Sequence, residues 1–285
     1  MQTKNTMEEK KQENITELKP EPERESGKKN PVFWVIVIVM SLLILAGLGY
    51  LGRMWYLDYS SEKRGKEIET YYSETTTLPQ ATKKVLKENP VDFESLQQTN
   101  SELYAWIKVP GTRVSYPIAQ SETDDEFYLH HDYLKNYLFA GTPYTEMCNK
   151  KDFSDPVTLV YGHNMYESEG TMFTTLHSFE DKAFFDSHKT FTIYMPGRML
   201  TYRIFSAFKF DNRHIMNSYD FEHGTDDLLA FQDTMLNPHS TIKNVRSGVT
   251  LNEKSKVVVL STCFLGDKSV RFLVCGVLVN DEPTK

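Results

Sequence analysis

The sequence VVVLSTCFLGDKSVRFLVCGVLV, Val257–Val279, contains two apolar runs separated by a polar, glycine-containing turn. The runs Lys256–Ser261 and Val270–Val279 are rich in valine and have the composition of buried strands. A tight hairpin would return Arg271, at the start of the second strand, toward Cys263, at the end of the first. This stretch therefore predicts sheet structure and places a guanidinium near a thiol.

Five further segments alternate or concentrate apolar residues in the manner of strands. They are Tyr104–Val109, Arg113–Ala119, Val157–Tyr161, Thr190–Met195 and Leu200–Phe210. In the longest, we expect one face to carry Tyr202, Ile204, Ser206, Phe208 and Phe210. Many short strands without regular intervening helices predict a mainly β domain, a closed barrel or a sandwich, with accessory helices.

Accessory helices are predicted around this sheet. Asp92 is placed to cap a short helix, and Thr225 to cap a later one that ends before Pro238. The charged segments Ser60–Tyr72 and Pro79–Glu88 also have helical character and predict a stalk.

An apolar run of twenty residues, Val32–Leu51, has the length that a helix needs to cross a bilayer. Residues 1–31 before it are polar and lack aromatic residues, so we expect a disordered tail. Lys28 and Lys29 favour a cytoplasmic N-terminus. A cleaved signal peptide is disfavoured by the long tail and the full-length run. The predicted organisation is a tail at 1–31, a single-pass span at 32–51, a helical stalk at 52–91 and a catalytic domain at 92–285 outside the cytoplasm.

Composition excludes several functional classes. The formal net charge of −7 argues against a nucleic-acid binder. Three cysteines, Cys148, Cys263 and Cys275, are too few for a disulfide framework. There is no HExxH or CxxC motif and no phosphate-binding glycine loop, so neither a metal nor another cofactor is predicted.

His163, Cys263 and Arg271 form the one set of residues with a clear chemical logic. His163 and Cys263 each follow an apolar strand, where rigid elements present catalytic side chains. A thiol with a pKa of about 8.5 needs a neighbouring base or cation to react at neutral pH. The histidine can move a proton, and the arginine can stabilise an oxyanion. These are the components of an acyl transferase.

At these residues the sequence resembles the class B sortases, cysteine transpeptidases of Gram-positive cell surfaces. The segment Val160–Met165 is similar to that family's Y-G-H-N-M motif, and Leu260–Cys263 to its L-S-T-C strand end. Arg271 follows at a suitable distance. The resemblance covers most of Asp92–Val279 and implies an eight-stranded barrel with N-terminal helices and a helix between the sixth and seventh strands.

The same resemblance implies the reaction. Cys263 would attack a sorting signal of the Asn-Pro-x-Thr-Asn type after Thr, and His163 would protonate the leaving amine. An amine of a cell-wall peptide, on a lipid-linked precursor, would then resolve the thioacyl-enzyme and become joined to the surface protein. Arg271 would assist both steps. Signal contacts carry over to Leu129, Tyr161 and Ser261. Asp125 corresponds to a signal-binding position at which the family has Asn.

Three alternatives remain. An L,D-transpeptidase also uses His and Cys, but its S-H-G-C-x-R run is absent here. A non-enzymatic membrane-anchored scaffold would not need all of His163, Cys263 and Arg271, which are present. A class B-like pilin polymerase would use a subunit lysine as its nucleophile, and the sequence does not separate it from a wall-anchoring enzyme.

Overall fold

The computed structural model describes residues 31–73, 86–165, 170–264 and 267–285. The chain divides into two compact units, Met1–Leu51 and Gly52–Lys285. Because the second unit contains the sheet and all of the predicted site residues, it is described in most detail.

Helix α1 (Pro31–Glu69) is a single helix of 39 residues. Among the described residues it is the one helix that is long and apolar enough to cross a membrane, with a mean hydropathy of 2.8 in its most apolar window and none of that window buried. It continues through the segment for which a separate helix at Ser60–Tyr72 was predicted. No proline interrupts it after its first residue, and the i,i+4 pair Glu62–Lys66 supports its charged end.

The predicted helix at Pro79–Glu88 lies largely outside the described residues. Its last three residues, 86–88, are described and are extended, because Lys87 forms a β-bridge with Thr284 near the C-terminus. The predicted helix is therefore wrong for this part of the segment.

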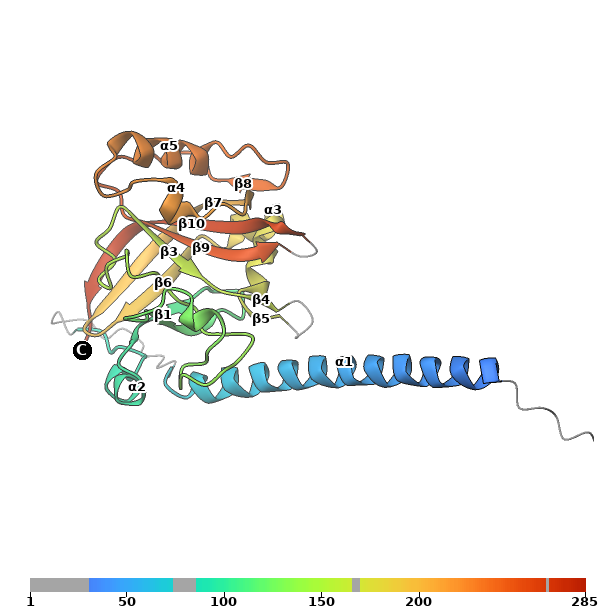
Figure 1. Cartoon of the computed structure of the whole chain (residues 1–285). Helices are drawn as coiled ribbons and strands as arrows, with labels where there is room; N and C mark the ends of the chain where they lie inside the picture. Colours follow the sequence, from blue (N-terminus) through green and yellow to red (C-terminus); the bar gives the residue numbers. More distant parts are fainter. Residues whose placement is uncertain (1–30, 74–85, 166–169, 265–266) are drawn as a thin grey trace, which may run out of the picture. The chain divides into compact units, whose positions relative to one another are not determined.

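A curled sheet of eight strands forms the body of the second unit (Figure 1). Its order is β2-β1-β6-β7-β10-β9-β3, and β8 pairs with β7. The β3–β9 pair is parallel and the other pairs are antiparallel. The strands are β1 (Leu103–Lys108), β2 (Ser115–Ala119), β3 (Val157–Tyr161), β6 (Thr190–Met195), β7 (Arg198–Asp211), β8 (Lys243–Val245), β9 (Val257–Phe264) and β10 (Asp267–Pro283); β4 (Asn164–Met165) and β5 (Thr171–Met172) form a separate ribbon.

The two outer strands of the sheet, β2 and β3, are joined through the backbone of one residue, Tyr144. Tyr144 forms a bridge with Ala119 at the end of β2 and another with Tyr161 at the end of β3. The Tyr161 and Tyr144 backbones exchange hydrogen bonds of 2.8 and 3.1 Å. The sheet is thus a half-barrel with this seam between its edges, which confirms the predicted barrel-type fold.

Alternate residues of the sheet face two different apolar layers. Val258 and Leu260 of β9 face the barrel interior, whereas Val257 and Val259 belong to a second layer on the outer face. The second layer lies beneath α4 (Ile215–Ser218) and α5 (Thr225–Leu236), and Figure 1 shows α5 lying across the sheet near β7. Odd-numbered β9 residues therefore point toward the α4–α5 side.

Two details of these elements differ from the sequence predictions. The cap of α5 is Gly224, not Thr225, which is the first helical residue. The long strand β7 does not keep one face, because Phe205 is an extra residue opposite the Cys275–Gly276 step of β10. This bulge exchanges the faces, so Ile204 packs in the barrel interior and Phe208 packs in the outer layer.

The remaining helical segments are short. They are α2 (Phe93–Thr99), η1 (Phe127–Leu129), η2 (Thr174–Glu180) and α3 (Lys182–Ser187). Asp92 caps α2 as predicted, because its carboxylate accepts a hydrogen bond of 3.0 Å from the Ser95 backbone N–H.

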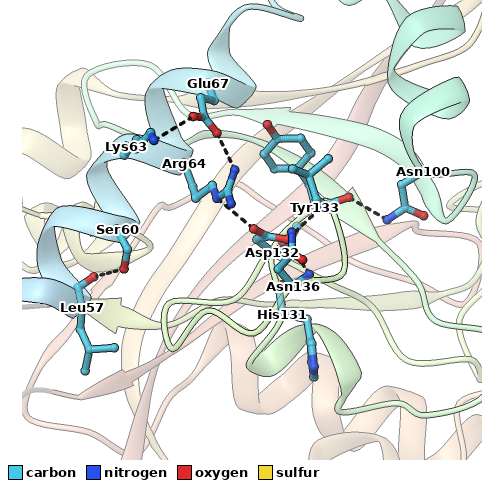
Figure 2. Close-up of polar contacts among 12 residues, drawn as sticks. Leu57, Ser60, Lys63, Arg64, Glu67, Asn100, His131, Asp132, Tyr133 and Asn136 are labelled. Carbon is cyan, nitrogen blue, oxygen red and sulfur yellow. Dashed lines mark hydrogen bonds and ion pairs between the residues drawn. The ribbon is translucent and has the colours of Figure 1, made fainter. Parts of the chain in front are cut away.

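An ion pair attaches the C-terminal part of α1 to a loop of the barrel (Figure 2). Arg64 Nε lies 3.0 Å from the Asp132 carboxylate, which is only 2% exposed. The other carboxylate oxygen of Asp132 accepts the backbone N–H groups of Leu134 and Asn136. Asp132 therefore fixes the loop internally and also binds the helix.

We expect Arg64→Met to lower the free energy of unfolding by about 2 kcal/mol, because it leaves a buried carboxylate without its counter-ion. Lys63→Met is the matched control, since Lys63 is exposed and lies 3.9 Å from Glu67 on the same helix. Urea denaturation of the full chain in detergent measures the difference. Equal effects of the two variants would contradict the role of the pair.

Candidate active site

Cys263 and Arg271 are direct cross-strand neighbours on β9 and β10. The Cys263 carbonyl accepts a hydrogen bond from the Asn164 side chain, as the Ser261 carbonyl does from the Gly162 backbone on the β3 side. Cys263 therefore directs its backbone polar groups away from β10. The pair is of the non-hydrogen-bonded antiparallel type, in which side chains lie closest, with Cα atoms about 4.5 Å apart.

His163 leaves the parallel strand β3 at the same end of the sheet. Tyr161 is paired with Ser261, so His163 and Cys263 each lie two residues beyond the last pair of parallel strands. The turn from Tyr161 to His163 requires Gly162, because a Cβ atom at that position would lie 2.7 Å from the Phe173 ring. The histidine backbone is also held, since its carbonyl accepts the Phe173 N–H at 2.9 Å.

One cavity of about 180 Å³ is lined by all three predicted catalytic residues. Leu129, Tyr161 and Ser261, predicted from the resemblance as signal-binding residues, also line it. Asp125 does not, because its carboxylate is turned to accept the Met147 backbone N–H at 2.6 Å. Seven of the other lining residues were not predicted: Glu126, Tyr144, Glu146, Asn212, Arg213, His214 and Ile215.

The His163 imidazole is fixed by its surroundings. Its Nε2–H donates to the Leu129 carbonyl at 2.9 Å, and the His130 and Phe139 rings each lie 5.4 Å from its centroid. Burial lowers the pKa of His163 to about 4; the Leu129 carbonyl opposes this shift and the His130 charge adds to it. At neutral pH His163 is therefore an uncharged imidazole with Nε2 protonated and Nδ1 able to accept a proton.

The low pKa of His163 predicts a pH-dependent stability. The unfolded histidine, with a pKa of about 6.5, takes up a proton as the pH falls, whereas the folded one stays neutral until about pH 4. Stability present above pH 6.5 is therefore lost toward pH 4. We expect this group to cost about 2.5 kcal/mol between pH 7.5 and 4.5, and His163→Gln to lack this component. Urea denaturation at both pH values measures the change. An equal loss of unfolding free energy in the two proteins would disprove the prediction.

A buried acidic residue, Glu146, forms a second polar centre in the cavity. His214 Nε2–H donates to its carboxylate at 2.8 Å, while His214 Nδ1 accepts the Asn217 backbone N–H at the start of α4. Burial raises the pKa of Glu146, and the His214 contact opposes the shift. Burial and the nearby Glu146 carboxylate both raise the pKa of Tyr161. Glu146 thus links the loop before β3 to α4 across the cavity wall.

The other two thiols are unsuited to nucleophilic chemistry. Burial and the Glu146 charge raise the pKa of Cys148 to about 11. Cys275 is fully buried among apolar side chains, which raises its pKa as well. All three cysteines are unpaired. Of the three, Cys263 is the one that lines the cavity with His163 and Arg271.

Comparison with known proteins identifies relatives of this chain in sequence and in structure. No family model matches the chain. Sortase B of Listeria monocytogenes is 28% identical over 224 residues, which cover 79% of this chain and 88% of the relative. The X-ray structure of Clostridium perfringens sortase B has a TM-score of 0.58 and 27% identity, and covers 66% of this chain and 100% of that one. Sortase B of Bacillus anthracis superposes with a TM-score of 0.63 at 24% identity, over 79% and 99% of the two chains.

The curled mixed sheet with its accessory helices is therefore a sortase fold, and the protein is a sortase-type cysteine transpeptidase. Within that fold, the relatives in sequence and structure are class B enzymes. The likeness in sequence and in structure supports a class B sortase.

Proposed function

We propose that Cys263, His163 and Arg271 are the catalytic residues of this transpeptidase and that its donor is a sorting signal of the Asn-Pro-x-Thr-Asn type. The observation that carries the proposal is the shared cavity, into which adjacent strands bring a thiol, a neutral imidazole and a guanidinium. The curated class B relatives support the same assignment of the reaction.

Acylation follows from the protonation state of His163. Nδ1 accepts the thiol proton as Cys263 Sγ attacks the Thr carbonyl, and Arg271 stabilises the oxyanion that forms. The C–N bond then breaks, and His163 returns the proton to the leaving amine. The product is a thioester between Cys263 and the Thr carbonyl.

Deacylation reverses the roles. An acceptor amine attacks the thioester, and His163 Nδ1 takes a proton from it as the new amide bond forms. The thiolate leaves and recovers the proton from the imidazolium. No metal or cofactor is required for this sequence of steps.

The cavity walls are proposed to hold the signal. Leu129 supplies apolar surface, while Tyr161 and Ser261 line the cavity two residues before His163 and Cys263 on their strands. Asp125 does not line the cavity and acts indirectly, because its carboxylate fixes the backbone at Met147, next to the lining residue Glu146.

We propose that the catalytic domain, residues 92–285, works outside the cytoplasm on a stalk, residues 52–91. Residues 32–51 are the single-pass anchor and residues 1–31 the cytoplasmic tail. The exposed apolar part of α1 supports an anchor in this position.

The acceptor is proposed to be a cell-wall peptide amine of a lipid-linked precursor. A solved sortase B complexed with triglycine, 26% identical to this chain, supports an amine acceptor. A pilin lysine is the second candidate, because a class B sortase of Streptococcus pyogenes involved in pilus biogenesis is 27% identical with a TM-score of 0.56.

Mass spectrometry of the purified enzyme incubated with candidate signal peptides tests the proposal. We expect a covalent adduct on Cys263 whose mass ends at the signal Thr, and its loss when an acceptor amine is added. Comparing triglycine with a lysine-containing peptide separates the two acceptor classes. An adduct on Cys148, or none with any peptide, would refute the assignment.

A further inference from the structure

The backbone of Cys263 lies beyond the point at which β9 loses one of its neighbours. Parallel pairing with β3 ends at Tyr161 and Ser261, and the Gly162 N–H satisfies the Ser261 carbonyl at 3.1 Å. The Cys263 carbonyl points to the same side two residues later, where no strand continues. Buried carbonyls in proteins are hydrogen-bonded almost without exception, so the groups that lie against this carbonyl help to fix the end of β9.

Two side chains occupy the place of the missing strand. Asn164 Nδ2 lies 3.0 Å from the Cys263 carbonyl oxygen, and His177 Nε2 lies 3.1 Å from the same atom. The two side chains also contact each other at 3.1 Å. Asn164 directly follows His163, so one side chain connects the segment that carries the imidazole to the backbone of the thiol.

His177 is itself held by an acidic side chain and two aromatic rings. Its Nδ1–H donates to the Glu180 carboxylate at 2.5 Å. Its ring stacks on Phe272 at 4.9 Å and meets the edge of Phe264 at 5.5 Å. Because Phe264 follows Cys263 and Phe272 lies next to Arg271, the ring contacts both strands of the catalytic hairpin.

We infer that Asn164, His177 and Glu180 form a positioning cluster that holds the Cys263 backbone so that its sulfur meets His163 and Arg271. This inference rests on the proposed catalytic role of Cys263. The three residues do not line the cavity, so they act through the main chain of the nucleophile and not on the substrate. A displacement of about 1 Å at a reacting atom costs about a hundredfold in rate, which sets the scale of the expected effect.

The test compares His177→Phe with His177→Gln in the full chain in detergent. Phe keeps an aromatic ring against Phe272 but removes both nitrogens, whereas the Gln amide still offers an oxygen that can accept from Asn164 and an N–H that can donate to the Cys263 carbonyl. We expect His177→Phe to lower kcat for a signal peptide about 10- to 100-fold with KM within twofold. His177→Gln should recover kcat to within about fivefold of the parent enzyme.

Two further variants make the result decisive. Glu180→Gln, on a side chain that is 31% exposed, keeps a hydrogen-bond acceptor and should lower kcat only about threefold. His188→Phe is the matched control, because His188 also stacks on a phenylalanine, Phe184, and lies outside the cluster; its kcat should stay within twofold. An unchanged kcat in His177→Phe, or an equal loss in His188→Phe, would overturn the inference.

The rate at which iodoacetamide alkylates Cys263 separates this inference from the proposed function. Alkylation needs no signal peptide, and we expect it to slow at least threefold at pH 7 in His177→Phe and not in His188→Phe. If Cys263→Ala kept transpeptidation, the proposed function would fail regardless of the alkylation rates. If only the alkylation and kcat effects of His177→Phe were missing, the positioning cluster alone would be wrong.

Discussion

Cys263→Ala should reduce cleavage of a quenched Asn-Pro-x-Thr-Asn peptide by about 10⁴-fold or more. Without the sulfur no thioester forms, and His163 and Arg271 have no nucleophile to assist. The removed side chain is small and partly exposed, so the fold should be retained. Circular dichroism and a fluorescence assay on the same preparation measure both properties.

The other two cysteines provide internal controls. Cys148→Ala should stay within about twofold of the parent rate, because that thiol has a pKa of about 11 and does not line the cavity. Cys275→Ala should also remain active, with a stability loss of about 1 kcal/mol from the cavity that it leaves in the outer apolar layer. Turnover by Cys263→Ala would rule out the thioester mechanism.

Arg271→Lys should lower kcat by about 10² to 10³, the loss typical of an oxyanion-stabilising donor. Lysine keeps the positive charge but lacks the planar fork of donors that a guanidinium presents from a fixed strand position. The Arg271 side chain is oriented in part by the hydrogen bond from its Nη1 to the Val270 carbonyl at 3.2 Å. We expect KM to change less than kcat.

Arg198→Lys is the matched control for this substitution. Arg198 forms a bidentate ion pair with Asp281 at the far end of the β7–β10 pair, outside the cavity. Its replacement should leave turnover within twofold. Near-normal rates in Arg271→Lys would show that position 271 needs only a cation, or that the residue is structural.

The strands that the sequence predicts most accurately are those with a continuous local pattern. Val157–Tyr161 and Thr190–Met195 are observed with the predicted bounds. Strand β9 extends three residues past its predicted end at Ser261, because pairing with β10 continues through Thr262 and Cys263. No local pattern records such a partner, and the same holds for the bulge at Phe205 in β7.

Some contacts of the site can also be predicted from the sequence, whereas others cannot. Cys263 and Arg271 meet because one hairpin joins them, and His163 meets them because β3 and β9 are parallel. Glu146 and His214 could not be found from their surroundings in the sequence, since both lie in polar loops. They come together only because α4 covers the outer face of the sheet.

The Tyr144 seam has a consequence for how a donor peptide can be recognised. Near the thiol, the last residues of β2 and β3, Ala119 and Tyr161, already have their N–H and C=O groups hydrogen-bonded to the main chain of residues 143–145. An extended donor peptide therefore cannot add as a further strand at this point, because the backbone groups that it would pair with are already hydrogen-bonded. Selection must depend on individual pockets, which favours a narrow choice of residues over general affinity for unfolded chains.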